Sequence, residues 1–212
     1  MTVTAWVLLA VAGVAAVVDW VAVAAGAKRI EYVAKPATLA LLVALAVVLD
    51  PRHADRRAWF VAALVLSLAG DVFLMVPRDL FVAGLGSFLL GHVAYTVGID
   101  LHPGPWWAIM VAAVIVACVG VVLASRILRA MADGGQRELV GPVVAYMVVI
   151  SAMVVSALAA GPWLAAVGAV LFFASDTLIA WERFVRPRAW MPVAIIVTYH
   201  LGQAGLVLSL VR

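Results

Sequence analysis

Long apolar runs alternate with short polar segments along the whole 212-residue chain. A helix that spans a membrane needs about 20 predominantly apolar residues. Charged residues, prolines and glycines divide the chain into eight runs of roughly this length. They cover roughly residues 4–25, 36–50, 58–76, 81–100, 105–124, 139–159, 162–181 and 191–211. The pattern therefore predicts an all-α polytopic transmembrane helix bundle of about eight spans, forming a single transmembrane domain over residues 1–212.

Composition agrees with this prediction. Hydrophobic residues make up 67% of the chain and charged residues only 12%, whereas about a quarter of the residues in soluble domains are charged. The longest connection, Ser125 to Glu138, is too short to form an extramembrane domain. The first apolar run is long enough to span, so we expect a retained helix and not a cleaved signal peptide. Any function is therefore expected to reside among the helices.

Basic residues are distributed unevenly between the two sides of the predicted bundle. Ten of the 14 Lys and Arg residues lie in or beside the first, third, fifth and seventh loops. Because cytoplasmic loops are enriched in positive charge, we expect these loops in the cytoplasm and both termini outside. Basic residues scattered between apolar runs indicate membrane topology and argue against a nucleic-acid partner. We expect a multi-pass protein of the cell membrane, specifically a bacterial inner membrane.

A weak internal repeat relates the third and fourth spans to the seventh and eighth. Residues 68–74 resemble residues 173–179, and each segment precedes a span with a central histidine, His92 or His200. The offset of four spans would give both halves the same orientation, unlike the inverted repeats of many transporters. A parallel four-plus-four repeat is one interpretation, and chance similarity between apolar helices is the other.

Two aspartates lie within predicted spans, where an ionisable group costs several kcal/mol and is a functional hypothesis by default. Asp71 and Asp176 have similar depths from the same side of the membrane. Two carboxyl groups held close together in a low dielectric do not both ionise easily. Such a pair would supply a general acid and a general base. The alternative is structural, with each Asp hydrogen-bonded to a neighbouring helix or to Lys35.

Polar side chains also follow one face of the fourth and the eighth spans. His92 and Tyr95 are three residues apart, and Tyr199 and Gln203 are four apart, with His200 close to the same stripe. Residues at these spacings share a helix face. We predict that both faces line a shared site, although interhelical hydrogen bonds are the simpler explanation for each histidine alone.

Lys35 precedes Pro36, and proline suits the first turn of a helix because it needs no hydrogen-bonded N–H there. The Lys35 ammonium would then lie at the membrane boundary, where it could bind a lipid phosphate or extend into water without a ligand. Asp19, in the first span, receives no role. Two Asp and two His residues could hold a metal ion. No local metal-binding motif such as His-x-x-x-His is present, so we predict neither a metal nor a cofactor.

Several short motifs occur in order along nearly the whole chain. They are Lys35-Pro36-x-Thr38, Gly70-Asp71-x-x-Leu74-Met75, Phe81-x-x-Gly84-x-x-x-Phe88-x-x-Gly91-His92-x-x-Tyr95, Ser175-Asp176, and Tyr199 with Gln203. In this combination the chain resembles the YhhN-like lysoplasmalogenase family, which consists of multi-pass membrane proteins. The resemblance implies hydrolysis of the vinyl ether bond of a lysoplasmalogen, which yields a fatty aldehyde and a glycerophospho-base.

This activity is compatible with the residues singled out above. An enol ether hydrolyses when an acid protonates its β-carbon and water adds to the resulting cation, which requires an acid, a base and no cofactor. We therefore predict that Asp71 and Asp176 are catalytic. The residues predicted to bind substrate are Lys35, His92, Tyr95, Tyr199, His200 and Gln203. The expected partners are a lysophospholipid substrate and membrane lipids.

Two other functions remain open at this stage. Buried carboxylates could bind protons or cations in a small transporter or a lipid-binding protein. A transporter site is expected near the midplane, whereas the two aspartates and Lys35 gather toward one side. A metal-dependent lipid amidase or esterase would require bound zinc and would be sensitive to chelators.

Overall fold

The computed structural model describes residues 1–78, 80–160 and 162–211. Within these residues it contains eight α-helices, each long and apolar enough to cross a membrane. They are α1 (Val3–Ala24), α2 (Lys28–Val48), α3 (Ala54–Met75), α4 (Phe81–Asp100), α5 (Trp106–Asp133), α6 (Val140–Ala159), α7 (Trp163–Phe184) and α8 (Met191–Leu208), with a short 3-10 turn over Arg137–Leu139 before α6. The predicted all-α bundle of eight spans is confirmed.

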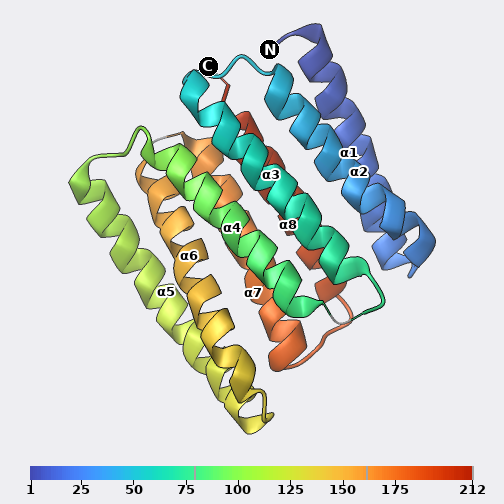
Figure 1. Cartoon of the computed structure of the whole chain (residues 1–212), viewed down its shortest axis with the longest axis vertical. Helices are drawn as coiled ribbons and strands as arrows, with labels where there is room; N and C mark the ends of the chain where they lie inside the picture. The colour runs from blue at the N-terminus through green and yellow to red at the C-terminus, as the bar shows by residue number, and fades with distance from the viewer. Residues whose placement is uncertain (79, 161, 212) are drawn as a thin grey trace.

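Both chain termini lie at the same end of the bundle (Figure 1). The loops α1–α2, α3–α4, α5–α6 and α7–α8 lie at the other end, which we call the basic end because most Lys and Arg residues lie in or beside these loops. The end with the termini is called the opposite end.

The two halves of the chain share an order of helix packing. In the first half α1 packs on α2 and α3 on α4, and in the second half α5 packs on α6 and α7 on α8. The contacts between halves also correspond, since α4 packs on α6 and α8 packs on α2. This correspondence is the arrangement expected of a parallel four-plus-four repeat.

Small residues bring α7 and α8 into close backbone contact. A Cβ atom added at Gly168 would lie 2.7 Å from the Leu206 nitrogen, and one added at Gly202 would lie 2.9 Å from the Phe172 nitrogen. Such close approaches matter in lipid, where the hydrophobic effect does not drive helices together. Helices there associate through van der Waals packing instead. The contact holds the polar residues of α8 at a fixed height against α7.

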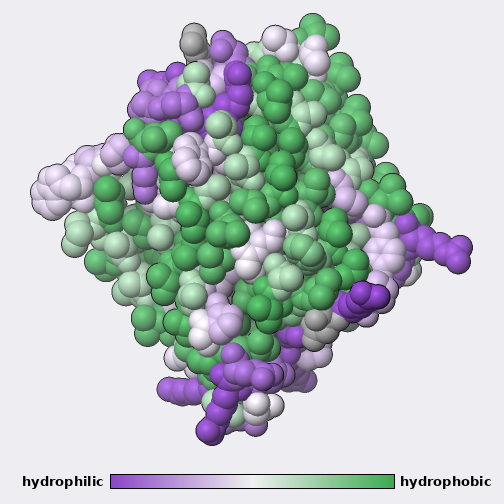
Figure 2. Space-filling view, in the orientation of Figure 1, coloured by the Kyte–Doolittle hydropathy of each residue, from purple (hydrophilic) through white to green (hydrophobic). Residues whose placement is uncertain are grey.

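Apolar side chains cover much of the surface as well as the core. On the face shown in Figure 2, hydrophobic residues cover the middle of the bundle and hydrophilic residues gather mainly toward its ends. Four tryptophans, Trp106, Trp107, Trp163 and Trp190, are more than half exposed at helix ends. These positions suit rings that anchor a protein at the membrane interface.

Two helices are longer than the hydrophobic pattern predicts. Helix α2 begins eight residues earlier than expected, and α5 continues nine residues further, to Asp133. Pro36 is therefore inside α2 and not in its first turn, so that prediction is wrong. The first turn instead contains Glu31, whose carboxylate lies 2.8 Å from the Lys28 ammonium. A helix end with such charges leaves the hydrocarbon, so apolar runs alone underestimate its length.

Candidate active site

An ion pair joins α2 to α3 near the basic end. The Lys35 Nζ lies 2.9 Å from one carboxylate oxygen of Asp71, and the Tyr199 hydroxyl of α8 donates a 2.7 Å hydrogen bond to the other. The Asp71 side chain is only 1% exposed and that of Lys35 16%. Lys35 therefore points into the bundle and pairs with Asp71. This contact is the structural alternative that the sequence left open for Asp71, and it differs from the expected position of the ammonium at the membrane boundary.

Glycines place these helices close enough for the ion pair to form beside α4. A Cβ atom at Gly70, next to Asp71, would lie 2.6 Å from the Phe88 ring. A Cβ atom at Gly84 would lie 2.6 Å from Leu74 in the same way. Because a Cβ atom at Gly70 would collide with the Phe88 ring, the glycine allows α3 to lie close to α4. The adjacent Asp71 is positioned by this close contact.

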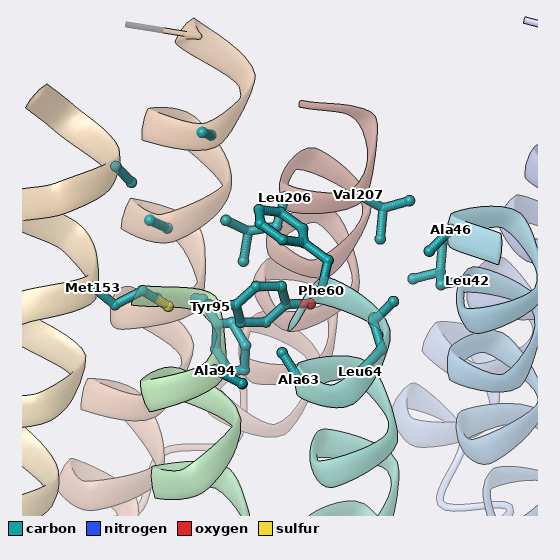
Figure 3. Packing of buried hydrophobic residues seen from close by; sticks show 14 of the residues in the cluster. Leu42, Ala46, Phe60, Ala63, Leu64, Ala94, Tyr95, Met153, Leu206 and Val207 are labelled. Carbon is teal, nitrogen blue, oxygen red and sulfur yellow. The ribbon is translucent and has the colours of Figure 1, made fainter. Parts of the chain in front are cut away.

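One turn further along α8, Gln203 meets α4. The Tyr95 hydroxyl donates a 2.6 Å hydrogen bond to the Gln203 carbonyl oxygen. Tyr95 is fully buried and packs edge-on against Phe60, with ring centroids 5.1 Å apart (Figure 3). The predicted polar stripe of α8 therefore faces α3 and α4, and its deeper part joins α4 to α8 within the apolar core.

Asp176 lies in a second polar cluster, formed by α4, α6 and α7. Its carboxyl group accepts a short hydrogen bond from the Tyr146 hydroxyl. The Nε2 atom of His92 lies 3.6 Å from the same oxygen and has no hydrogen-bond partner among the described residues. His92 and Tyr146 also pack edge to face, with ring centroids 5.3 Å apart. His92 therefore lies beside Asp176, one of the two residues predicted to be catalytic.

This second cluster opens on a mostly apolar pocket. Asp176 is the only acidic or basic residue among those that line it, within the part of the chain that the structure describes. The lining residues come from α3 to α7 and are Leu74, Phe81, Leu85, Phe88, Ile127, Val143, Tyr146, Met147, Ile150, Phe173, Asp176, Thr177, Ile179, Ala180 and Phe184. The pocket thus places one carboxyl group in a lining that is otherwise mostly apolar.

Asp71 does not line this pocket. Phe88 packs on Gly70, next to Asp71, and also lines the pocket. Its ring packs edge-on against those of Phe172 and Tyr199, with centroids 6.3 and 5.9 Å away. The two carboxyl groups lie within electrostatic range of each other, but this structure does not place them on one cavity wall. Phe88, Phe172 and Tyr199 form an aromatic cluster beside Asp71, and hydrophobic periodicity does not predict such a cluster.

His200 faces a different neighbour from Tyr199. The indole N–H of Trp20 in α1 donates a 3.2 Å hydrogen bond to His200 Nδ1, and His200 Nε2 lies 4.0 Å from the Asp19 carboxylate. Consecutive helical residues differ in direction by about 100°, so Tyr199 can face Asp71 while His200 faces α1. The eighth span therefore contributes to two clusters and not to one stripe.

The structure does not gather a metal site from the two aspartates and two histidines. Among the described residues, His92 lies beside Asp176 and His200 beside Asp19. Three potential ligands do gather at the opposite end, where one atom each of His53, Asp55 and His102 lies within 4.8 Å of the others. The two imidazole rings there are stacked 3.8 Å apart. Stacked rings cannot easily direct nitrogens at one ion, and His102 already contacts Asp55 at 3.0 Å.

Sequence reasoning missed Tyr146 and left Asp19 without a role. Tyr146 lies about 9 Å from the start of α6 and Asp176 about 12 Å from the end of α7, measured from the same end of the bundle. A polar residue on an apolar helix at the depth of a candidate carboxylate is a usable signal. That signal would have identified Tyr146 as a partner of Asp176.

Comparison with known proteins agrees with the motifs. The YhhN family model matches residues 30–210. Lysoplasmalogenases of Mycobacterium bovis and Mycobacterium tuberculosis are each 38% identical over 175 residues, which is 79% of this chain and 65% of theirs. Lysoplasmalogenase TMEM86B of Homo sapiens is 33% identical over 150 residues, 71% of this chain and 62% of its own length.

The chain thus aligns with slightly less than two thirds of the length of each of these relatives. No solved structure matches it. The family match extends from α2 through α8 and includes Lys35, Asp71 and Asp176. On this match, and on the motifs that the structure places around Asp71 and Asp176, the chain belongs to the YhhN family.

Proposed function

We propose that this protein is an intramembrane hydrolase that cleaves the vinyl ether bond of a lysoplasmalogen. The products would be a fatty aldehyde and a glycerophospho-base. The relatives in Mycobacterium and Homo sapiens that align with most of this chain are named lysoplasmalogenases. The observation that carries the proposal is the pocket itself, an apolar space suited to one hydrocarbon chain with the Asp176 carboxyl group in its wall.

The two clusters fit opposite parts of one single-chain lipid. The alkenyl chain occupies the apolar pocket, so that its vinyl ether group lies against Asp176. The glycerol backbone then extends past Phe88 toward Lys35, whose ammonium receives the phosphate. This placement puts Asp176 next to the alkenyl carbons and Asp71, the partner of Lys35, nearer the ether oxygen and the glycerol.

The first chemical step is protonation of carbon. Asp176, in its carboxylic acid form, transfers a proton to the β-carbon of the vinyl ether, and the π electrons of the double bond form the new C–H bond. The α-carbon and the ether oxygen then share the positive charge of an oxocarbenium ion. The Asp176 and Asp71 carboxylates stabilise this cation electrostatically in a site with little water. Tyr146 orients the Asp176 carboxyl group through its hydrogen bond.

The second step is addition of water. Asp71 is the carboxylate of the pair because it forms an ion pair with Lys35, and it removes a proton as water bonds to the α-carbon. The resulting hemiacetal collapses as its hydroxyl proton goes to Asp176 and the proton on Asp71 goes to the departing glycerol oxygen. One water is consumed and both aspartates return to their starting forms. No metal or cofactor takes part in this sequence.

Membrane orientation adds one element to the proposal. Asp71, Asp176 and Lys35 all lie in the half of the bundle nearer the basic end. If the basic loops face the cytoplasm, as the distribution of Lys and Arg predicts, the lysolipid enters from the cytoplasmic leaflet. The polar head can then stay near water while the chain enters the pocket between α4, α5, α6 and α7.

The proposal is tested by incubating the purified full chain with three lysolipids that differ only at the first carbon of the chain. They are a 1-alkenyl, a 1-alkyl and a 1-acyl lysophosphatidylethanolamine. We expect one equivalent each of fatty aldehyde and glycerophosphoethanolamine from the alkenyl lipid only, unaffected by chelators. Release of fatty acid from the acyl lipid, or no aldehyde from the alkenyl lipid, would refute the proposal.

A further inference from the structure

Asp19 of α1 is a buried carboxyl group that the proposed reaction does not use. It is fully buried, and neither of its oxygens has a hydrogen-bond partner among the described residues. Leaving a buried polar group unpaired costs about 1–3 kcal/mol, and more for a charged one. Groups of this kind in native proteins call for an explanation, such as an ion or a ligand that the site binds.

The neighbours of Asp19 show what kind of ligand it would take. The indole of Trp20 is a donor only, so the His200 Nδ1 that it contacts at 3.2 Å acts as an acceptor. The proton of the neutral imidazole is then on Nε2, which faces Asp19 at 4.0 Å. His200 thus presents an N–H to the carboxylate from one side, and the geometry leaves the carboxylate oxygens free to accept further hydrogen bonds.

Charge around Asp19 is also unbalanced in favour of a cation. Lys35, Glu31, Asp71 and Lys28 all lie within electrostatic range of Asp19, and Lys35 already pairs with Asp71 at 2.9 Å. With Asp19 included, this group has three carboxyl groups and two ammonium groups. A further cation beside Asp19 would balance the charge and supply the missing donors.

We propose that Asp19, with His200, is the subsite for the primary ammonium group of an ethanolamine headgroup. This inference rests on the proposed function for the lipid and extends it by naming the headgroup. In phosphoethanolamine the ammonium is two methylene groups from the phosphate ester oxygen, so a phosphate at Lys35 brings the ammonium to a neighbouring position. Asp19 provides two acceptors for the three N–H donors of that group.

The same geometry excludes choline as the preferred headgroup. A trimethylammonium group has no N–H donors, so it cannot form hydrogen bonds with either Asp19 oxygen. It is also bulkier, and Asp19 and His200 are 0% and 2% exposed. Asp19 lies outside residues 30–210, which the family model matches. The selectivity would therefore be supplied by a helix outside the matched region.

The first test is made on the unaltered full chain in detergent, with lysolipids that cannot be cleaved because they have a saturated 1-alkyl ether. Binding is measured for the ethanolamine, N-methyl, N,N-dimethyl and choline headgroups and for the plain glycerophosphate. We expect the ethanolamine lipid to bind at least ~10-fold more tightly than the choline and phosphate lipids. Hydrogen bonds to charged groups contribute enough binding free energy for a difference of this size. Affinity should fall with each added methyl group.

The second test compares Asp19→Asn with Asp50→Asn, a matched change at an exposed residue beyond the end of α2. Asp19→Asn should lower affinity for the ethanolamine lipid ~10-fold or more and leave the phosphate lipid within ~3-fold. Asp50→Asn should change neither. Equal affinities in the methyl series, or equal loss for all lipids in Asp19→Asn, would overturn the proposal. Because the lipids are uncleavable, this result does not depend on whether the protein releases aldehyde.

Discussion

The ion pair between Lys35 and Asp71 makes a quantitative prediction about stability. Lys35→Met removes the ammonium but keeps most of the side-chain length. Asp71 then remains 1% exposed with Tyr199 as its only described hydrogen-bond donor. Removing one partner of a buried pair typically costs about 3–5 kcal/mol, because the other charge is left uncompensated. We therefore expect Lys35→Met to be one of the most destabilising single changes in the site.

The magnitude can be checked with a second substitution. Asp71→Asn in the Lys35→Met background removes the uncompensated charge and keeps an oxygen that accepts the Tyr199 hydrogen bond. The double variant should therefore recover most of the stability that Lys35→Met loses. For a chain of this size, a change of 3–5 kcal/mol corresponds to a shift of about 10 °C in Tm.

Thermal unfolding of the purified variants in one detergent, followed by circular dichroism, measures both effects. Lys28→Met is the matched control, since the Lys28 side chain is 68% exposed in its pair with Glu31. An exposed ion pair contributes at most about 1 kcal/mol to stability, so the Tm of Lys28→Met should barely differ from that of the unaltered protein. If Lys35→Met left Tm unchanged, or if Asp71→Asn made the Lys35 variant still less stable, the buried ion pair would not have the energetic role assigned to it.

Three further predictions concern the pocket, the phosphate and the topology. Val143→Phe should fill part of the pocket, so kcat/KM should fall most for long alkenyl chains, and equal losses at all chain lengths would place the chain elsewhere. Lys35→Met should raise KM for the lysolipid and also lower kcat, because Asp71 loses the ion pair that keeps it a carboxylate, and an unchanged KM would remove Lys35 from phosphate binding. In a Cys118→Ser background, an impermeant thiol reagent added outside should label a cysteine at Thr2 and not one at Arg186. The reverse pattern would invert the proposed orientation.

The sequence predicted the fold well because the bilayer constrains it strongly. Eight apolar runs gave eight helices, and α4 has the predicted bounds, 81–100. Errors arose at ends such as that of α2, where the Lys28 and Glu31 pair extends the helix beyond the hydrocarbon. Hydrophobicity reports the part of a helix inside lipid, whereas the helix end depends on local charges and hydrogen bonds.

The candidate site was predicted less completely. Depth and spacing identified Asp71, Asp176, Tyr199 and Gln203, because these residues are polar within apolar spans. They did not reveal that Phe88 packs beside Asp71 and also lines the pocket, since an aromatic residue in a span cannot be distinguished from core packing by sequence. The direction of His200 depends on the rotation of α8 against α1, which spacing along one helix does not fix.

Aldehyde release by Asp71→Asn, Asp176→Asn and the double variant tests the central claim most directly. Asparagine keeps the size of the side chain but cannot exchange a proton in the required way. Each single change should lower kcat at least ~100-fold, the low end for loss of a general acid or base. The double change should lower it little further, because residues that act as one unit are not additive. Full aldehyde release by both single variants, measured with protein whose Tm shows that it is folded, would contradict the two-carboxylate mechanism.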